Sequence, residues 1–415
     1  MESKREETKL GRMLTLDAMR GAAAVAVVTY HALTVAPLTA LSGWQWWLPT
    51  VTAYIVHFAY AGIYLFFVIS GFCIHLHWAK ARAAGIENPV IHFFLFWKRR
   101  VRRLYPAYLA ALALYLCYAA YKIPVKVTGF YLWDVGLHLF MLHNLDARTT
   151  YTINGAFWTL AIEEQLYLAY FLLLFLRIRY GWARTLLFCA GARIGWLIMS
   201  RYVSQSLGIA IPVTEAAATN WFIWALGALS VEAALGVTKL PRWCYRLSFA
   251  CVALLCAMGL AQVLPMIDDL TWVHDVGWLV MHPAWGFGFF ILVNYSVSAE
   301  LRWRVIPSRA PRLITALASI GLISYSLYLI HVLILMQWYR FGFTGLHILS
   351  ISLLITTPLS VAFGWVFFRL FERPFMTSPG AVAVPTPPRY VPSDKDQIDQ
   401  VVRRREEAVL EASFD

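Results

Sequence analysis

The stretch Leu16–His31, LDAMRGAAAVAVVTYH, opens an apolar segment of about 20 residues, long enough to cross a bilayer as a helix. It contains two ionisable residues, Arg20 and His31, whose separation of eleven residues corresponds to about 16 Å of helix and nearly the same helix face. Because ionisable groups are costly inside a membrane, both are functional candidates. The alternative is an arginine that reaches back to the interface and a histidine satisfied between helices. Asp17 is predicted to form a local ion pair with Arg20.

The composition of the 415 residues is that of a membrane protein. Hydrophobic residues make up 60% and charged residues 14%, and the mean hydropathy is +0.61. Soluble domains are about one quarter charged. The net charge of +12 is therefore interpreted through membrane orientation, not through binding of nucleic acid. The six cysteines show no paired spacing, so we predict neither disulfides nor a metal site.

Apolar segments separated by charged residues, Gly or Pro predict an all-α bundle of about ten transmembrane helices. The approximate spans are 16–36, 54–77, 104–121, 156–176, 184–200, 217–236, 246–264, 273–295, 313–338 and 344–371. A shorter apolar piece, Leu132–Leu142, is predicted to lie at the interface or to re-enter the membrane. With a cytoplasmic N-terminus, the cytoplasmic loops carry seventeen Lys and Arg and the opposite loops five, which favours both termini inside.

The chain changes character near Thr377. A Pro-rich segment follows, and then the charged segment VVRRREEAVLEA. We predict a transmembrane domain over residues 1–375 and a cytoplasmic tail over 376–415 that is largely disordered.

Three ionisable residues fall in the same outer half of the membrane when depth is counted along the helices. They are His31, Glu163 in FWTLAIEEQLYLAY and His331 in ISYSLYLIH. A carboxylate beside an imidazole fixes the tautomer and supports a general base. The alternative is three separate hydrogen bonds between helices. Ser324 and Tyr328 share one helix face with His331.

The segment FWKRRVRRLYPAY holds five cations in six residues, Lys98–Arg103, and is predicted to lie in a loop, with Pro106 in the first turn of the next helix. One or two of these cations are explained by membrane topology alone, because positive residues keep a loop at the inner surface. Because Arg suits bidentate phosphate contacts, the cluster and Arg20 are a candidate site for a phosphorylated cytoplasmic ligand. Ser70 and Gly71, in FFVISGFCIH, are predicted to serve close helix packing.

Together these motifs resemble the acyltransferase-three family of integral membrane acyltransferases. LDAMRGAAAVAVVTYH resembles the family's opening motif, including its Arg–ten residues–His spacing. Later motifs follow in the family's order, namely FFVISGF, RRVRRLYPAY, FWTLAIEEQLYL, ISYSLYLIH and FERPF. The resemblance covers about residues 14–375. Met19 stands where leucine is more usual. Unlike in longer members, we expect no lipase-like periplasmic domain after the bundle.

The resemblance implies O-acyl transfer, commonly of acetyl, from cytoplasmic acyl-CoA. The acceptor would be a hydroxyl of an envelope or exported carbohydrate or, in some members, of a small natural product. The residues on matching motif positions are Arg20, His31, Arg99, Arg100, Arg103, Glu163, Tyr325 and His331.

We assign three roles to these residues and to Tyr328. The candidate catalytic residues are His31 and Glu163. The candidate residues for the phosphates of coenzyme A are Arg20, Arg99, Arg100 and Arg103. The candidate residues for the acceptor are Tyr325, Tyr328 and His331.

The expected location is the bacterial inner (plasma) membrane, with the lipid bilayer and a carbohydrate or glycolipid acceptor as partners. A proton-coupled exporter of lipid-linked sugars is an alternative function, because buried His and Glu also suit proton relays. A membrane scaffold without catalysis is a third. Binding of coenzyme A distinguishes the acyltransferase from the exporter. The sequence leaves the acceptor, the acyl chain length and the oligomeric state open.

Overall fold

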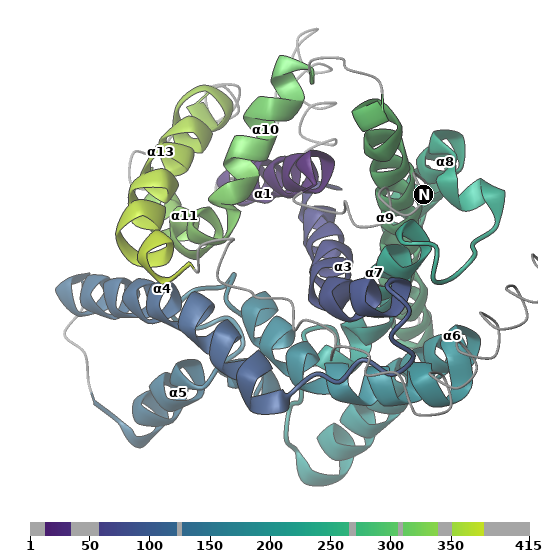
Figure 1. Cartoon of the computed structure of the whole chain (residues 1–415). Helices are drawn as coiled ribbons and strands as arrows, with labels where there is room; N and C mark the ends of the chain where they lie inside the picture. The colour runs from purple at the N-terminus through teal and green to yellow at the C-terminus, as the bar shows by residue number, and fades with distance from the viewer. Residues whose placement is uncertain are drawn as a thin grey trace, which may run out of the picture. The chain divides into compact units, whose positions relative to one another are not determined.

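The computed structural model describes residues 13–34, 58–122, 127–264, 271–305, 310–338 and 351–376 (Figure 1). Every regular element in these ranges is helical, which confirms the predicted all-α class. The α-helices are α1 (Leu14–Thr34), α3 (Gly62–Ala83), α4 (Phe93–Lys122), α5 (Gly129–Leu139), α6 (Trp158–Leu207), α7 (Ala217–Ala234), α8 (Leu247–Val263), α9 (Thr271–Val305), α10 (Arg312–Leu322), α11 (Ser324–Trp338) and α13 (Thr357–Phe367). The shorter helices are η3 (Phe58–Ala61), η4 (His143–Leu145), η5 (Arg242–Tyr245), η8 (Ser352–Thr356), η9 (Phe368–Glu372) and η10 (Arg373–Phe375).

Four helical stretches of the described chain are long and apolar enough to cross a membrane, and a bent pair, α10 with α11, could add a fifth. The four are Phe58–Ala83, Phe93–Lys122, Trp158–Leu207 and Leu354–Phe375. The number of ten spans and the cytoplasmic termini therefore stay predictions. Contacts divide the chain into Met1–Phe375 and Met376–Asp415. Parts of the predicted spans and nearly all of the predicted tail lie outside the described residues, at 35–36, 54–57, 344–350 and 377–415.

Helix α4 starts eleven residues earlier than predicted, at Phe93 instead of residue 104. The prediction of a loop over the arginine cluster was wrong, because Lys and Arg are themselves good helix formers. Pro106 lies inside the helix and not in its first turn. The arginines are therefore distributed around a helix at about 100° per residue instead of sharing one flexible loop.

Two of the predicted helix boundaries also differ. The single helix predicted over 313–338 is broken at Ile323, where α10 and α11 meet at 76°. The segments predicted as separate helices over 156–176 and 184–200 together form α6, but the predicted break between them falls at the non-helical residue Gly181, whose φ of 76° and ψ of 172° suit glycine. Membrane depth counted along straight helices is therefore unreliable where these helices bend.

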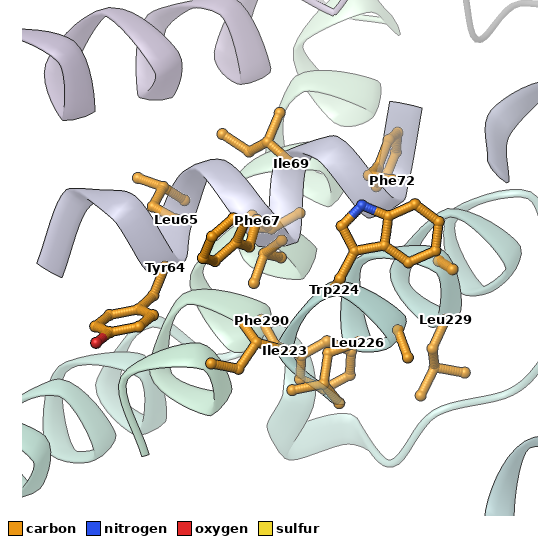
Figure 2. Close-up of a cluster of buried hydrophobic side chains, with 14 of the residues drawn as sticks. Tyr64, Leu65, Phe67, Ile69, Phe72, Ile223, Trp224, Leu226, Leu229 and Phe290 are labelled. Atoms are coloured by element: carbon orange, nitrogen blue, oxygen red, sulfur yellow. The ribbon is translucent and has the colours of Figure 1, made fainter. Parts of the chain in front are cut away.

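Helices α3 and α7 pack so closely that their backbones touch. A Cβ atom at Gly71 would lie 2.0 Å from the carbonyl oxygen of Trp224, and one at Gly227 would lie 1.9 Å from that of Val68. This reciprocal contact confirms the predicted packing role of Gly71, since small residues let membrane helices approach. Figure 2 shows the surrounding cluster, in which side chains of α3 and α7 interlock beside Phe290 of α9.

Helix α1 is held in the same way against α10. A Cβ atom at Gly21 would lie 1.9 Å from the carbonyl oxygen of Leu317, and one at Gly321 would lie 1.9 Å from that of Asp17. Figure 1 shows α1 lying among α3, α10 and α11. Because the chain bends immediately after α10, α11 crosses α1 further along its length.

Glu300 of α9 fixes the start of α1. Its buried carboxylate accepts hydrogen bonds from the backbone N–H groups of Leu14 (2.9 Å) and Thr15 (2.8 Å) and from the Thr15 hydroxyl (2.7 Å). The first N–H groups of a helix lack partners within it, and the helix dipole favours an anion there. A distant glutamate thus anchors the helix that carries Arg20 and His31.

Candidate active site

His31 and His331 form a direct pair between α1 and α11. The Nδ1 atom of His31 lies 3.0 Å from Nε2 of His331, and Nδ1 of His331 lies 2.7 Å from the carbonyl oxygen of Tyr328. A carbonyl only accepts, so we assign the proton of His331 to Nδ1. Its Nε2 then accepts from Nδ1–H of His31, and Nε2 of His31 becomes the basic nitrogen.

The hydroxyls of Tyr328 and Tyr325 are used within the protein. Tyr328 donates to the carbonyl oxygen of Ala156 (2.9 Å) and accepts from the Thr159 hydroxyl (2.7 Å). Tyr325 donates to the carbonyl oxygen of Leu104 (3.0 Å). These bonds fix the face of α11 against α4 and the start of α6, and the acceptor-binding role of both tyrosines stays a prediction.

Glu163 lies beside Arg20, not beside His31 as predicted. Its carboxylate accepts a hydrogen bond from Tyr167 (3.3 Å) and lies against the Ser70 hydroxyl, within electrostatic reach of Arg20 and Arg103. Counting depth from an exposed start of α6 caused the error. The residues at that start, Ala156 and Phe157, are fully buried, so the helix begins inside the protein.

Arg20 is bound on both sides of its guanidinium. Its Nη2 donates to the sulfur of Cys73 (3.1 Å), and Nη1 lies 3.6 Å from Asp17, which confirms the predicted local ion pair. The side chain remains 26% exposed, so a ligand can still reach it.

The arginine cluster of α4 is divided between faces. Arg100 follows Phe96 by one turn, and its guanidinium lies over the rings of Phe96 (5.3 Å) and Tyr167 (5.9 Å). Arg103 is exposed and acts on Glu163. Arg99 instead lies near His77 of α3. Of the predicted phosphate ligands on α4, the structure brings Arg100 and Arg103 to Glu163 and its neighbours and places Arg99 elsewhere.

We call the resulting continuous set of polar side chains the seam. Thr159 and Glu163 are one turn apart on α6, and they connect the histidine pair to the arginines. The seam consists of His31, His331, Tyr328, Thr159, Glu163, Tyr167, Arg20, Arg100 and Arg103. In the described ranges, no group of three or more His, Cys, Asp or Glu could hold a metal ion.

Residues 13–369 match the family model described as an acyltransferase domain. The chain belongs to this acyltransferase family. It is therefore an integral membrane enzyme that transfers acyl groups other than aminoacyl groups, and the matched range contains the whole seam.

The chain is also similar to a curated relative, peptidoglycan O-acetyltransferase OatA of Listeria monocytogenes serovar 1/2a. The two are 26% identical over 180 residues, which is 39% of this chain and 24% of the relative. The match thus spans about a quarter of the relative's length. No solved structure matches the chain.

Two buried carboxylates of this acyltransferase were missed by the sequence analysis. Glu164 is 5% exposed and borders the seam near Arg100, and Glu372 is 1% exposed and accepts from the Ser326 hydroxyl at 2.6 Å. Both lie in quoted motifs, FWTLAIEEQLYL and FERPF. The signal available in the sequence was a charged residue within an apolar helix, which by itself marks a candidate.

Proposed function

We propose that this enzyme moves an acetyl group from cytoplasmic acetyl-CoA to a hydroxyl of an envelope carbohydrate. The observation that carries the proposal is the seam, which joins a cationic end to an imidazole pair. Arg20 and His31 are eleven residues apart on one helix, so the two ends are about 16 Å apart. The peptidoglycan O-acetyltransferase named above supports a carbohydrate acceptor.

The residues at the cationic end suit a phosphorylated donor. Guanidinium groups pair with phosphates in a bidentate manner, and Glu163 lies within electrostatic reach of Arg20 and Arg103, which limits their mutual repulsion. Arg20 and Arg103 would hold the phosphates of the donor, Arg100 lies over Tyr167 beside them, and Arg99 would add positive charge at the entrance. A thioester supplies an activated acyl group, so positioning and one base suffice for transfer.

His31 is proposed as the general base. Its Nε2 takes the proton from the acceptor hydroxyl as the oxygen attacks the thioester carbonyl carbon. His31 returns that proton to the sulfur when the carbon–sulfur bond breaks, so the products are an ester and a free thiol. His331 holds the tautomer of His31, while the backbone carbonyl of Tyr328 binds His331 and the Thr159 hydroxyl binds the side chain of Tyr328. Glu163 keeps Arg20 oriented and is proposed to act through it.

The proposed topology has about ten spans, both termini in the cytoplasm of a bacterium and the seam arginines at the inner face. It is tested by single cysteines at Glu87 and Phe140, which lie between helices on opposite predicted sides, after replacement of the exposed cysteines. Phe140→Cys should react with an impermeant thiol reagent from outside, and Glu87→Cys should not. The opposite pattern would invert the proposed orientation.

The proposed reaction is tested with purified protein in liposomes, radiolabelled acetyl-CoA and soluble peptidoglycan fragments. We expect label to appear on the glycan and to be released by mild alkali, as an O-ester requires. Arg103→Gln should raise the KM for acetyl-CoA, more so at low salt, while Arg102→Gln on the same helix serves as the matched control. Sugar export without labelled product would instead favour the transporter.

A further inference from the structure

Glu164 and Arg100 carry buried polar atoms that lack partners. Neither carboxylate oxygen of Glu164 makes a hydrogen bond within the described chain, although the residue is 5% exposed. The Nε atom of Arg100 is equally buried and unbonded. The two residues interact electrostatically, yet no ion pair within 4.0 Å joins them in the described ranges.

Such atoms are rare in folded proteins because burial removes their water without replacing its hydrogen bonds. Here they belong to side chains that the surroundings hold in place. Arg100 is stacked on Phe96 and Tyr167, which fixes the plane of its guanidinium. Glu164 directly follows Glu163 on α6. It therefore borders the seam near Arg100. The arrangement is rigid and incomplete, as expected of a site that binds a ligand.

The charges at this place restrict the ligand's chemistry. A phosphate would suit Arg100 but would meet Glu164 and Glu163. An ammonium group would suit Glu164 but would meet Arg100 and Arg103. A carboxyl oxygen accepts hydrogen bonds in either ionisation state, and a guanidinium only donates them. A neutral group with one N–H donor and one C=O acceptor gives each residue a hydrogen bond, and an amide is such a group.

We propose that Glu164 and Arg100 bind an amide of the pantetheine arm of the donor, the carboxylate accepting its N–H and Arg100 Nε–H donating to its carbonyl. This inference rests on the proposed function. Pantetheine carries its two amides between the phosphates and the sulfur of coenzyme A. The specificity for a pantetheine thioester then comes from Glu164 and Arg100, and Arg100 contacts the arm, not the phosphates.

The test compares acetyl-pantetheine with two analogues in which an ester oxygen replaces the N–H of one amide or the other. For the wild-type enzyme, one analogue should show a KM raised roughly 10-fold, because a hydrogen bond to a charged acceptor is lost. In Glu164→Leu the KM for acetyl-pantetheine itself should rise. The ratio of the KM of the ester analogue to the KM of acetyl-pantetheine should then approach one. Glu164→Gln serves as a second variant of the same shape, and Glu87→Gln, which changes an exposed glutamate, should keep the wild-type ratio.

The outcomes separate the two proposals. If the wild-type enzyme uses acetyl-pantetheine and both analogues with equal KM, the amide subsite is wrong while the proposed function stands. If Glu164→Leu and Glu164→Gln both retain the wild-type ratio of KM values, Glu164 does not accept the hydrogen bond of the amide N–H. The inference is then overturned. If the wild-type enzyme transfers acetyl from neither acetyl-CoA nor acetyl-pantetheine, the proposed function fails and the inference fails with it.

Discussion

Two buried histidines of this protein have opposite surroundings. His75 of α3 and His331 of α11 are both 0% exposed, and both contact another helix. His75 has its Nδ1 3.1 Å from the Tyr170 hydroxyl and its Nε2 3.0 Å from Glu232. His331 is bonded to a backbone carbonyl and to His31, a second group that can take up a proton.

The partner of His75 is fully occupied. Glu232 also accepts from Arg177 (2.7–3.2 Å), from the indole of Trp182 (2.9 Å) and from the Thr238 hydroxyl (2.7 Å). This network connects α3, α6 and α7, and every polar atom of His75 and Glu232 in it has a partner. We interpret it as a structural clamp, because a group bound on all sides has nothing left to offer a substrate.

The seam and the residues that border it are less completely hydrogen-bonded than His75 and Glu232. The seam contains a pair of imidazoles with a basic nitrogen, and it borders an unbonded carboxylate at Glu164 and an unbonded guanidinium nitrogen at Arg100. The comparison teaches that burial of an ionisable residue does not identify a catalytic site in this protein. The seam and its border differ from the clamp in their incomplete hydrogen bonding within the described residues, and each prediction below tests that distinction.

The largest effect is expected at His31. In His31→Gln, kcat should fall by roughly two to four orders of magnitude, because the amide can keep a hydrogen bond to His331 but cannot act as a base. Thermal unfolding in detergent should be unchanged. The measurements are acetyl transfer and the Tm of the same preparation. Transfer at nearly the wild-type rate would make His31 a packing residue and move the base to His331 or Glu163.

The clamp should show the opposite pattern. Glu232→Ala leaves His75, Arg177 and Trp182 buried without their acceptor, so the free energy of unfolding should fall by about 3–5 kcal/mol. The molecules that remain folded should transfer acetyl at the wild-type rate. Unfolding is followed by denaturant titration and activity is normalised to folded protein. A stable variant with a large loss of kcat would place Glu232 in the chemistry instead.

A smaller effect is expected at Tyr328, which supports His331 without touching the substrate. Tyr328→Phe keeps the backbone carbonyl that binds His331 but removes the two hydrogen bonds that fix its side chain against Ala156 and Thr159, each worth about 1 kcal/mol. The position of His331 should loosen, so kcat should fall roughly 5–10-fold with an unchanged KM for acetyl-CoA. Tyr121→Phe, at a side chain that is 81% exposed, is the control. A change confined to KM would return Tyr328 to the acceptor-binding role predicted from the sequence.

The smallest effect is expected at Arg148, an exposed residue in the loop before α6. Arg148 bonds to Asp146 (2.7 Å) and lowers the pKa of that carboxyl from 3.8 to about 2. A lowered pKa stabilises the fold above pH 3.8, and this contribution is lost as the pH falls towards 2. Arg148→Ala should therefore slightly lower Tm at pH 5 and leave it unchanged near pH 2. An equal loss at both pH values would mean that the arginine acts by packing.

Much of this protein could be predicted from the sequence because it follows from local rules. Apolar length and composition predict helices, and the spacing of Arg20 and His31 on one helix fixes the span of the seam. The small residue Gly71 within an apolar stretch predicts a close helix contact, which the structure has at Trp224. The ordered motifs also predict the acyltransferase family, which the match over residues 13–369 confirms.

The partners of the polar residues were decided by the tertiary structure alone. His31 pairs with His331 and not with Glu163 because a bend at Ile323 and a buried start of α6 shift the helices relative to each other. Arg99 lies away from Arg100 and Arg103 because the segment is helical, and within the described residues neither carboxyl oxygen of Glu164 has a hydrogen-bond partner. A sequence lists the groups that can ionise. Which of them are satisfied depends on contacts between helices that are hundreds of residues apart, and no local rule contains that information.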